Sequence, residues 1–405
     1  ERQFSDSQCS IVFTDDTALE KVINAVGKCE RVKKIICVRN CSSKPHILPS
    51  NVVEWIEVIT SPRQHNIVQV NSESVAFLPY SSGTTGSPKG VMLSHRNIGT
   101  SIDTFIDHYN REIYSVIGPK NHSWYNETYI LNLPFYHILG FLLLNISLLS
   151  GGTAVVTGKF EPRLFLETIE KYRLVTCGAA PMGRDLCLEF LERHRNVKYL
   201  CQGYGMTECG FSHLSTLNVK ESFAGIGKAV ANSEQKIIDT NGNEVRVGES
   251  GELCIRSPTV MLGYLNRPES TRETIDSAGW LHTGDVGYME ADGRTFIVDR
   301  LKELIKVKGL QVAPAELEDL LLSHPLIRDA AVIGFPDSRI GELVRAFVVR
   351  ANESLNEEGV IKFVAEKVSA YKQITGGVKF VEQIPKSPSG KILRRLLRDQ
   401  VAEEM

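Results

Sequence analysis

The sequence lacks an excess of either charge and lacks paired cysteine motifs. Its 46 Lys and Arg residues nearly balance 48 Asp and Glu residues, which gives a net charge of −2. Nucleic-acid binding normally needs a basic face, so no nucleic-acid partner is expected. The nine cysteines are an odd number without C-x-x-C spacing. They are therefore expected to be reduced thiols of an intracellular protein, with no zinc site.

Signals for secretion, lipid attachment and membrane insertion are also missing. The chain starts with a polar stretch at Glu1, and residues 401–405 carry no peroxisomal tripeptide. The longest uncharged run, residues 138–158, is broken by polar side chains and by Gly151 and Gly152. It predicts a buried helix followed by a buried strand, with no transmembrane segment. The expected location is intracellular, in the cytoplasm, and the oligomeric state stays open.

Alternating helical and strand patterns in the first part of the chain predict a layered α/β core. Residues 18–26 are expected to form a helix, residues 34–39 and 130–134 form strands, and Ser94 caps a further helix. Such alternation is typical of parallel sheets. A length of 405 residues is too great for one ordinary core and indicates two or three domains.

After about residue 225, hairpin signals replace this alternation. Asn241-Gly242 and Asp292-Gly293 predict tight turns, and Pro314 suits the first turn of a helix. We expect an α/β large domain at residues 1–300, with an antiparallel β subdomain at about 225–300. A small mobile α+β C-terminal domain is expected at residues 301–405. Its elements are a helix reaching Ser323, strands at 330–334, 344–350 and 377–382, a helix within 357–372 and a basic helix at 392–399.

A loop rich in glycine and hydroxyl groups is the most informative motif. It follows an apolar stretch, residues 75–79, that predicts a buried strand. Glycines let backbone N–H groups approach an anion, hydroxyls add donors, and a lysine adds a mobile positive charge. The loop therefore predicts a phosphate-binding site, whereas a solvated linker would not need its Pro-Lys-Gly end. Its residues are Ser81, Ser82, Gly83, Thr84, Thr85, Gly86, Ser87, Pro88, Lys89 and Gly90.

This loop differs from the Walker A loop, in which a lysine followed by Ser or Thr opens a helix. Here Gly90 follows the lysine. An unrelated phosphate-loop kinase would also need magnesium ligands elsewhere and finds little support.

Three further segments follow the loop in order. They are Gln-Gly-Tyr-Gly-Met-Thr-Glu at 202–208, Gly-Trp-Leu-His-Thr-Gly-Asp at 279–285 with its continuation at 298–302, and Pro-Lys-Ser-Pro-Ser-Gly-Lys at 385–391. Together the four signatures closely resemble the adenylate-forming superfamily. That superfamily includes acyl-CoA synthetases, coumarate–CoA ligases, insect luciferases and adenylation domains of peptide synthetases. The resemblance extends from about residue 9 to residue 399.

The resemblance implies an ATP-dependent acid–CoA ligase. Such enzymes join a carboxylate to the α-phosphate of Mg-ATP, release pyrophosphate, and transfer the acyl group from AMP to coenzyme A. The implied partners are ATP, CoA and an apolar carboxylic acid, fatty or aromatic, with Mg²⁺ as the metal. The stretch Lys306-Val307-Lys308-Gly309 favours a CoA ligase. A luciferase-like member would need the same site residues.

The resemblance also implies roles for single residues at the nucleotide. Ser81 to Lys89 would hold the β- and γ-phosphates. Glu208 would bind Mg²⁺, and Thr207 would reach the α-phosphate. Asp285 and Arg300 would hold the ribose. The adenine would lie among Gly178, Ala179, Ala180, Tyr204 and Gly205.

Two groups would act at the acid, and one segment would act in the thiol step. His137 would lie beside the carboxylate, and Lys391 would bridge carboxylate and phosphate in the transition state. Lys306, Lys308 and Gly309 would face the site after the small domain rotates about a hinge at Lys302.

Simpler interpretations stay open for several of these residues. His137 could be a packed structural histidine, and Asp285 a turn residue. The three arginines of the last helix are expected to form a solvated basic face, with guidance of CoA phosphates as the alternative. They are Arg394, Arg395 and Arg398.

The chain departs from the family pattern in two places. A family segment that precedes Cys9 has no counterpart, which would expose a sheet edge. After an expected helix at 161–172, residues 171–176 run directly into the adenine turn, so roughly 25–30 residues, about one βα unit, are missing. A non-catalytic or impaired nucleotide-binding remnant is therefore the alternative to an active ligase.

Overall fold

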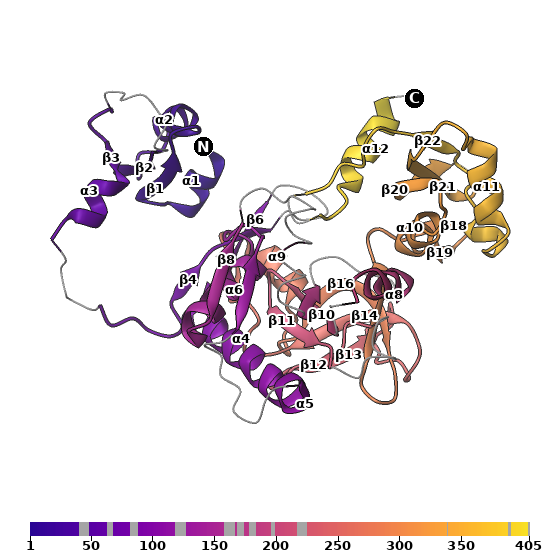
Figure 1. The fold of residues 1–405 in the computed structure, drawn as a ribbon, viewed down its shortest axis with the longest axis horizontal. Coiled ribbons are helices and arrows are strands. Elements are labelled where there is room, and N and C mark those ends of the chain that lie inside the picture. The colour runs from indigo at the N-terminus through magenta and orange to yellow at the C-terminus, as the bar shows by residue number, and fades with distance from the viewer. Residues whose placement is uncertain are drawn as a thin grey trace.

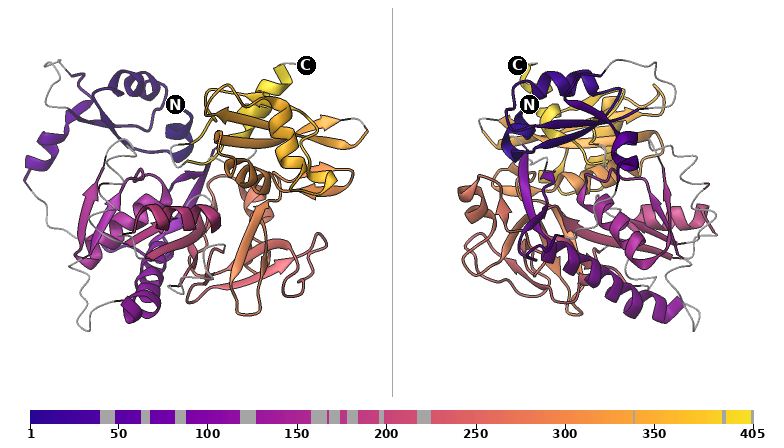
Figure 2. Two further views of the ribbon diagram at one scale, coloured as in Figure 1. Left: turned by 45° about the vertical axis from the view of Figure 1, so that its right-hand side comes forward. Right: turned by 90° about the vertical axis from the view of Figure 1, so that its left-hand side faces the viewer.

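The fold was analysed in a computed structural model. It describes residues 1–39, 48–62, 68–81, 88–117, 127–157, 167, 174–177, 184–195, 199–216, 225–337, 339–387 and 390–403. A small N-terminal unit and a C-terminal unit lie on the same side of a larger central body (Figures 1 and 2). The first and last helices of the chain both lie on that side.

The N-terminal unit is a three-stranded parallel sheet, β1 (Ile11–Asp15), β2 (Lys34–Val38) and β3 (Val52–Glu54), in that order. It carries α1 (Arg2–Ser7), α2 (Leu19–Val26) and α3 (Trp55–Thr60). Because side chains alternate along a strand, Val12 and Ile35 are buried while Ile11 and Phe13 face outward. The helix at 18–26 and the strand at 34–39 are thus confirmed within a residue.

In the central body, β6 (Lys89–Ser94) pairs with β4 (Val75–Phe77), β5 (Tyr80–Ser81) and β15 (Gly263–Tyr264). Helix α4 (His95–His108) begins after Ser94, whose side chain accepts from the Asn97 backbone in a reciprocal capping box. A π-helix (Tyr109–Tyr114) and α5 (Ser115–Ile117) continue it. Helix α6 (Ile138–Ser150) packs on α4, and Phe105 and Leu142 join one core.

Two further sheets complete the body. Strands β7 (Thr128–Leu131) and β8 (Thr153–Val156) form a parallel pair. The other sheet has the order β12 (Lys228–Ala229), β11 (Gly210–Leu214), β10 (Tyr199–Met206) and β9 (Leu174–Cys177), with α8 (Arg184–Arg193) between β9 and β10. The turn between β10 and β11 carries Glu208.

The expected hairpin region is an antiparallel sheet of order β13 (Glu234–Ile238), β14 (Gly251–Arg256), β16 (Leu281–Met289) and β17 (Thr295–Arg300). Helix α9 (Pro268–Thr274) lies between β15 and β16 in the chain. Both predicted turns are present, since Gly242 and Gly293 adopt positive φ angles of 85° and 86°.

The C-terminal unit has a mixed sheet covered by helices. Its strands are β18 (Ile305–Val307), β19 (Leu310–Val312), β20 (Ile327–Asp337), β21 (Gly341–Arg350) and β22 (Val378–Phe380). Its helices are α10 (Pro314–Leu322), α11 (Glu357–Ala365), a 3-10 turn (Ala370–Lys372) and α12 (Arg394–Glu403). Pro314 opens α10 as predicted. The helix expected within 357–372 ends earlier, at Ala365.

Two burial predictions were wrong. Val75 is 46% exposed because β4 is an edge strand that pairs only with β6 among the described strands. Val156 on β8 is also exposed, since β8 pairs only with β7 in the described parts of the chain. Among the described residues, no helix is both long enough and apolar enough to cross a bilayer. The helix expected at 161–172 lies almost wholly outside the described residues.

Candidate functional site

The two ends of the glycine-rich loop meet in one antiparallel pair. Ser81 on β5 lies opposite Lys89 on β6. Residues 82–87, which include Ser82, Gly83, Thr84, Thr85 and Gly86, lie outside the described part of the chain. The Lys89 Nζ lies 4.7 Å from the ring centroid of Tyr264, a cation–π distance.

Tyr264 also contacts the expected magnesium ligand. Its hydroxyl donates to Oε1 of Glu208 at 2.9 Å, and the Glu208 residue is only 6% exposed. Burial and the Glu208 charge raise the pKa of Tyr264, which keeps its hydroxyl protonated as a donor. A chain of contacts therefore links the end of the phosphate loop to a buried carboxylate. Thr207, the neighbour of Glu208, is half-buried in the same turn.

The expected ribose ligand, Asp285, lies on β16 directly opposite Arg300 on β17. Asp285 is 4% exposed, and its Oδ1 lies 3.1 Å from Nε of Arg300. Its Oδ2 accepts a hydrogen bond of 2.5 Å from the hydroxyl of Tyr204. Burial and the Asp285 charge raise the pKa of Tyr204. Both oxygens of this carboxylate are thus held by side chains of other strands, Arg300 on the neighbouring β17 and Tyr204 on β10 of another sheet.

Lys391 reaches this site from the C-terminal unit. Burial and, to a lesser extent, the nearby positive charge of Arg300 lower the pKa of Lys391 to about 8. The carboxylates of Asp285 and Glu303 act in the opposite direction. A lysine more than 100 positions along the chain from Asp285 is therefore brought within electrostatic reach of the candidate ribose site.

His137 occupies the N-cap of α6, where its Nδ1 accepts from the backbone N–H of Leu139 at 3.3 Å. Burial lowers the pKa of His137, so the imidazole is neutral near pH 7. The next turn of α6 places Phe141 on Phe77 of β4, with ring centroids 4.0 Å apart. The histidine is thus a structural cap of the helix that packs on β4 through Phe141.

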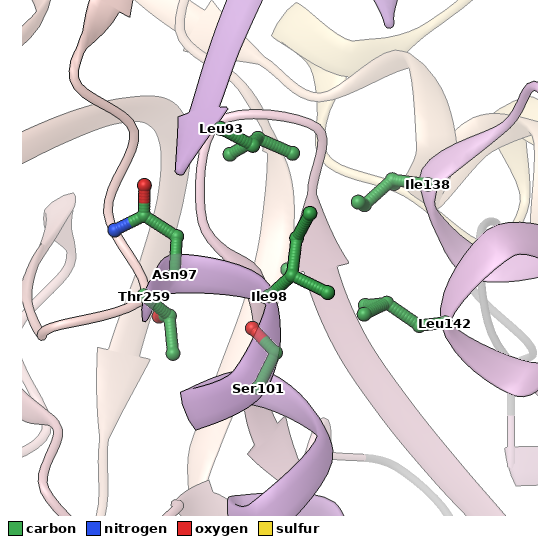
Figure 3. Close-up of a pocket in the computed structure, with 8 residues that line it drawn as sticks. Leu93, Asn97, Ile98, Ser101, Ile138, Leu142 and Thr259 are labelled. Atoms are coloured by element: carbon green, nitrogen blue, oxygen red, sulfur yellow. The ribbon is translucent and has the colours of Figure 1, made fainter. Parts of the chain in front are cut away.

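Two separate cavities lie near the start of α6. Figure 3 shows Leu93, Ile98, Ile138 and Leu142 converging on a gap that has no room for a water-sized molecule, so this gap belongs to the core. A second, larger cavity of about 180 Å³ lies at the carboxyl ends of β7 and β8, beside Pro134 and Phe135. Ligands of parallel sheets commonly bind at such ends.

The other predicted site residues lie in three separate segments, and one of these segments is outside the described part of the chain. Gly205 pairs closely with β11, and a Cβ there would meet the Gly210 carbonyl oxygen at 1.9 Å, so only glycine fits. Gly178, Ala179 and Ala180 lie outside the described residues. Lys306, Lys308 and Gly309 lie in the exposed β18–β19 hairpin, where Lys308 and Gly309 have positive φ.

The prediction of a solvated basic face on the last helix was wrong for two of its arginines. Arg394 pairs with Glu318 at 2.6 Å, and both side chains are nearly buried. Arg398 pairs with the buried Glu303. These contacts fix α12 to the C-terminal unit only a few residues after Lys391. Sequence reasoning missed Tyr264, Glu303 and Glu318, because no motif spacing distinguishes them from ordinary tyrosine and acidic residues.

With this geometry established, comparison with known proteins identifies the class. The AMP-binding enzyme family matches residues 1–176 and 171–265, and the AMP-binding enzyme C-terminal domain matches residues 316–391. The chain belongs to the AMP-binding enzyme family. The resemblance to adenylate-forming enzymes is thereby confirmed.

Within the family, the chain is similar to acid–CoA ligases. It is 40% identical to 4-coumarate–CoA ligase 1 of Petroselinum crispum and 42% identical to 4-coumarate:CoA ligase 1 of Petunia hybrida. Each alignment covers 99% of this chain and 77% of the relative. These relatives support an enzyme of the acid–CoA ligase type.

Solved structures confirm the expected fold class of a large α/β domain with a small C-terminal domain. ATP-bound MatB from Rhodopseudomonas palustris superposes with a TM-score of 0.85 at 23% identity, over 98% of this chain and 80% of that one. The anthranilate CoA ligase AuaEII, in complex with anthranoyl-AMP, also has a TM-score of 0.85 at 23% identity. That match covers 100% of this chain and 81% of the other. At these identities the likeness concerns the fold alone.

The comparisons also agree with the expected internal gap. The two stretches matched by one family overlap at residues 171–176, as happens when a family segment is skipped between them. The alignment with the Petroselinum relative spans 443 positions, although this chain has 405 residues. The relatives therefore carry internal residues that this chain lacks.

Proposed function

We propose that this chain is an ATP-dependent acid–CoA ligase that activates an apolar carboxylic acid, fatty or aromatic. The observation that carries the proposal is the placement of Lys391 beside Arg300 and Asp285. In this arrangement Arg300 from the large domain and Lys391 from the small domain both act on the Asp285 carboxylate, which could accept hydrogen bonds from ribose hydroxyls. A carboxylate oxygen of the acid would form a bond to the α-phosphorus while the bond to pyrophosphate breaks. The CoA sulfur would then attack the acyl carbonyl, and AMP would leave.

The residues present fit magnesium and a nucleotide. Magnesium prefers one or two carboxylates together with phosphate oxygens, and Glu208 is a buried carboxylate beside the loop that ends at Lys89. When bound, Mg²⁺ would neutralise charge on the phosphate oxygens. Lys89 and Ser81 would hold the outer phosphates, and Thr207 the α-phosphate. Tyr204 and Gly205 would lie along the adenine, with Gly178, Ala179 and Ala180 as further candidates.

The acid would bind near His137. A neutral imidazole can donate one hydrogen bond to a carboxylate without holding it in a tight ion pair. The cavity of about 180 Å³ beside Pro134 has more apolar than polar lining residues, which supports an apolar acid. Its other lining residues are Leu131, Leu133, Phe135 and Val156, together with the polar Asn132 and Thr157.

The domain arrangement is part of the proposal. The large domain would comprise residues 1–300 and the mobile domain residues 301–405, with Lys302 at the hinge. Lys391 is half-buried and within electrostatic reach of Asp285 and Arg300, whereas Lys306, Lys308 and Gly309 are exposed. The present arrangement would therefore serve adenylation, and rotation would bring the β18–β19 hairpin to the site for the thiol step. A cross-link that fixes the present arrangement should preserve adenylation and abolish thioester formation; survival of both steps would rule rotation out.

A specific observation favours a second candidate, an impaired nucleotide-binding protein. The internal gap leaves β8 with one described partner and an exposed Val156. Acid-dependent exchange of labelled pyrophosphate into ATP separates the two candidates, tested with a panel of fatty and aromatic acids. Exchange supports the ligase, whereas ATP binding without exchange supports the second candidate. Product analysis with CoA then separates a ligase from a luciferase-like member.

Lys391→Ala is the direct test of the proposed site. We expect exchange to fall by about 10²- to 10³-fold, the usual effect of removing one transition-state donor, with little change in ATP affinity. Lys367→Ala is the matched control, since Lys367 is an exposed lysine of the same domain that lies over the Phe363 ring. Equal exchange in the two variants would overturn the role of Lys391.

A further inference from the structure

Three potential metal ligands lie together on two neighbouring strands, β14 and β16. Glu252 and Cys254 are two positions apart on β14 and therefore share one face of the sheet. His282 on β16 is the direct cross-strand partner of Cys254. Cysteine spacing along the chain cannot reveal this cluster, because the ligands come from two strands that are joined only in the fold.

We propose that Glu252, Cys254 and His282 form a binding site for a divalent cation of borderline softness, with zinc as the fitting ion. The Cys254 Sγ lies 3.7 Å from Nδ1 of His282, and that nitrogen lies 3.0 Å from Oε2 of Glu252. The three ligand atoms all lie within 4.8 Å of one another. Tetrahedral zinc with bonds of about 2.0–2.3 Å separates its ligands by roughly 3.3–3.6 Å, so small side-chain shifts suffice.

The surroundings of His282 suit a metal-bound imidazole. Its second nitrogen, Nε2, lies 3.9 Å from Oδ2 of Asp276. Metal-bound histidines usually direct the other ring N–H at a carboxylate, which fixes the tautomer and strengthens the ligand. The His282 side chain is 30% exposed, so water can reach the cluster and fill a fourth position.

Binding must release one proton. A cysteine binds a metal ion as the thiolate, so the Cys254 thiol must lose its proton. When the sulfur–metal bond forms, the thiol proton leaves to solvent. The apparent affinity should therefore increase as the pH rises.

Occupation of this site should affect the proposed nucleotide site. The other oxygen of Glu252, Oε1, accepts the backbone N–H of Gly284 at 2.9 Å. Gly284 directly precedes Asp285, so a carboxylate drawn toward a metal loosens the segment that holds Asp285. This consequence rests on the proposed function. The proposal of the metal site does not rest on that function, because binding of the metal ion is measured without nucleotide.

The test is titration of the full-length, metal-free chain with Zn²⁺ by calorimetry, and with Co²⁺ by absorption. We expect one ion per chain, a sulfur-to-cobalt charge-transfer band, and tighter Zn²⁺ binding at pH 7.5 than at pH 6.5. Cys254→Ser should remove the band. Asp276→Asn should weaken binding by about 10- to 100-fold while keeping the band.

The control is Cys37→Ser, which alters a buried cysteine of β2 in the separate N-terminal unit. This variant should bind both ions as the parent chain does. Glu252→Gln provides a second ligand variant, because an amide oxygen can still accept from Gly284 and preserve the fold. Circular dichroism verifies folding of each variant. The proposal would be overturned if the parent chain gave neither a heat of Zn²⁺ binding nor a cobalt charge-transfer band. Unchanged metal binding in Cys254→Ser would also overturn it.

Discussion

At the scale of single residues, Lys391 lies in an environment that is unusual for a lysine. Burial and Arg300 lower the pKa of Lys391 to about 8, below the usual lysine value. If adenylation needs the charged form, the free enzyme should lose activity as pH rises through 8 and keep it below. We expect kcat/KM for ATP in pyrophosphate exchange to fall about tenfold per pH unit on the alkaline side, because this ratio reports the free enzyme.

Lys391→Arg is the matched variant for that pH profile. A guanidinium stays charged at every working pH, so whatever activity remains should show no alkaline fall near pH 8. A parent-like alkaline limb in the arginine variant would assign the titration to another group.

Tyr264 is the residue that sequence reasoning missed and that contacts two predicted site residues. Tyr264→Phe keeps the ring under Lys89 but removes the hydroxyl that donates to Glu208. A hydrogen bond to a charged group contributes about 1.5–3 kcal/mol, so the Mg²⁺ concentration needed for half-maximal exchange should rise roughly 10- to 100-fold. Titration of exchange activity with Mg²⁺ measures this shift.

Tyr288→Phe serves as the comparison, since Tyr288 stacks on Phe296 in the antiparallel sheet. Its magnesium dependence should match that of the parent chain. An equal shift in both variants would show a general loss of packing instead of a specific role for Tyr264.

At the scale of elements, local signals predicted where helices and strands begin more reliably than how they are buried. Ser94 and Pro314 mark helix starts through short-range chemistry, and the Asn241-Gly242 turn acts within four residues. Burial of Val75 and Val156 depends on which strands lie alongside, and that information is not local. The approach of Lys391 to Asp285 is likewise a property of the tertiary fold, so only family resemblance could indicate it.

The attachment of α12 gives a prediction at this scale. Glu318 and Arg394 form a nearly buried ion pair, and Glu318 also accepts the backbone N–H of Val332 at 2.8 Å. Removing one partner leaves a buried charge, so Arg394→Met should lower the unfolding free energy by about 3–5 kcal/mol. Because α12 begins three residues after Lys391, exchange activity should fall as well.

A double variant separates these two effects. In Glu318→Leu with Arg394→Met, no charge is left unpaired, so much of the stability should return. Denaturant unfolding of the parent, the single variant and the double variant measures this recovery. A double variant no more stable than Arg394→Met would show that the pair acts through its hydrogen bonds to β20 and not through charge compensation.

At the scale of the whole molecule, apolar surface is concentrated where the chain has little described cover. Phe13 is 62% exposed on the N-terminal sheet, and Val156 is 60% exposed on β8. Leu148 and Leu149, at the end of the neighbouring α6, are about as exposed, at 69% and 70%. The exposed residues on α6 and β8 lie just before the internal gap relative to the family. Loss of the expected βα unit would account for this part of the surface.

Restoring that unit is the corresponding prediction. Inserting the internal stretch of the Petroselinum crispum 4-coumarate–CoA ligase 1 at residues 171–176 should cover β8 and the end of α6. Burying exposed apolar surface contributes about 25 cal/mol for each Å² removed from water, so the melting temperature should rise and binding of a hydrophobic dye should fall. A Gly/Ser insert of the same length is the control, because it lengthens the chain without adding an apolar face. If both inserts change melting temperature and dye binding equally, the apolar surface around β8 is not exposed because a βα unit is missing.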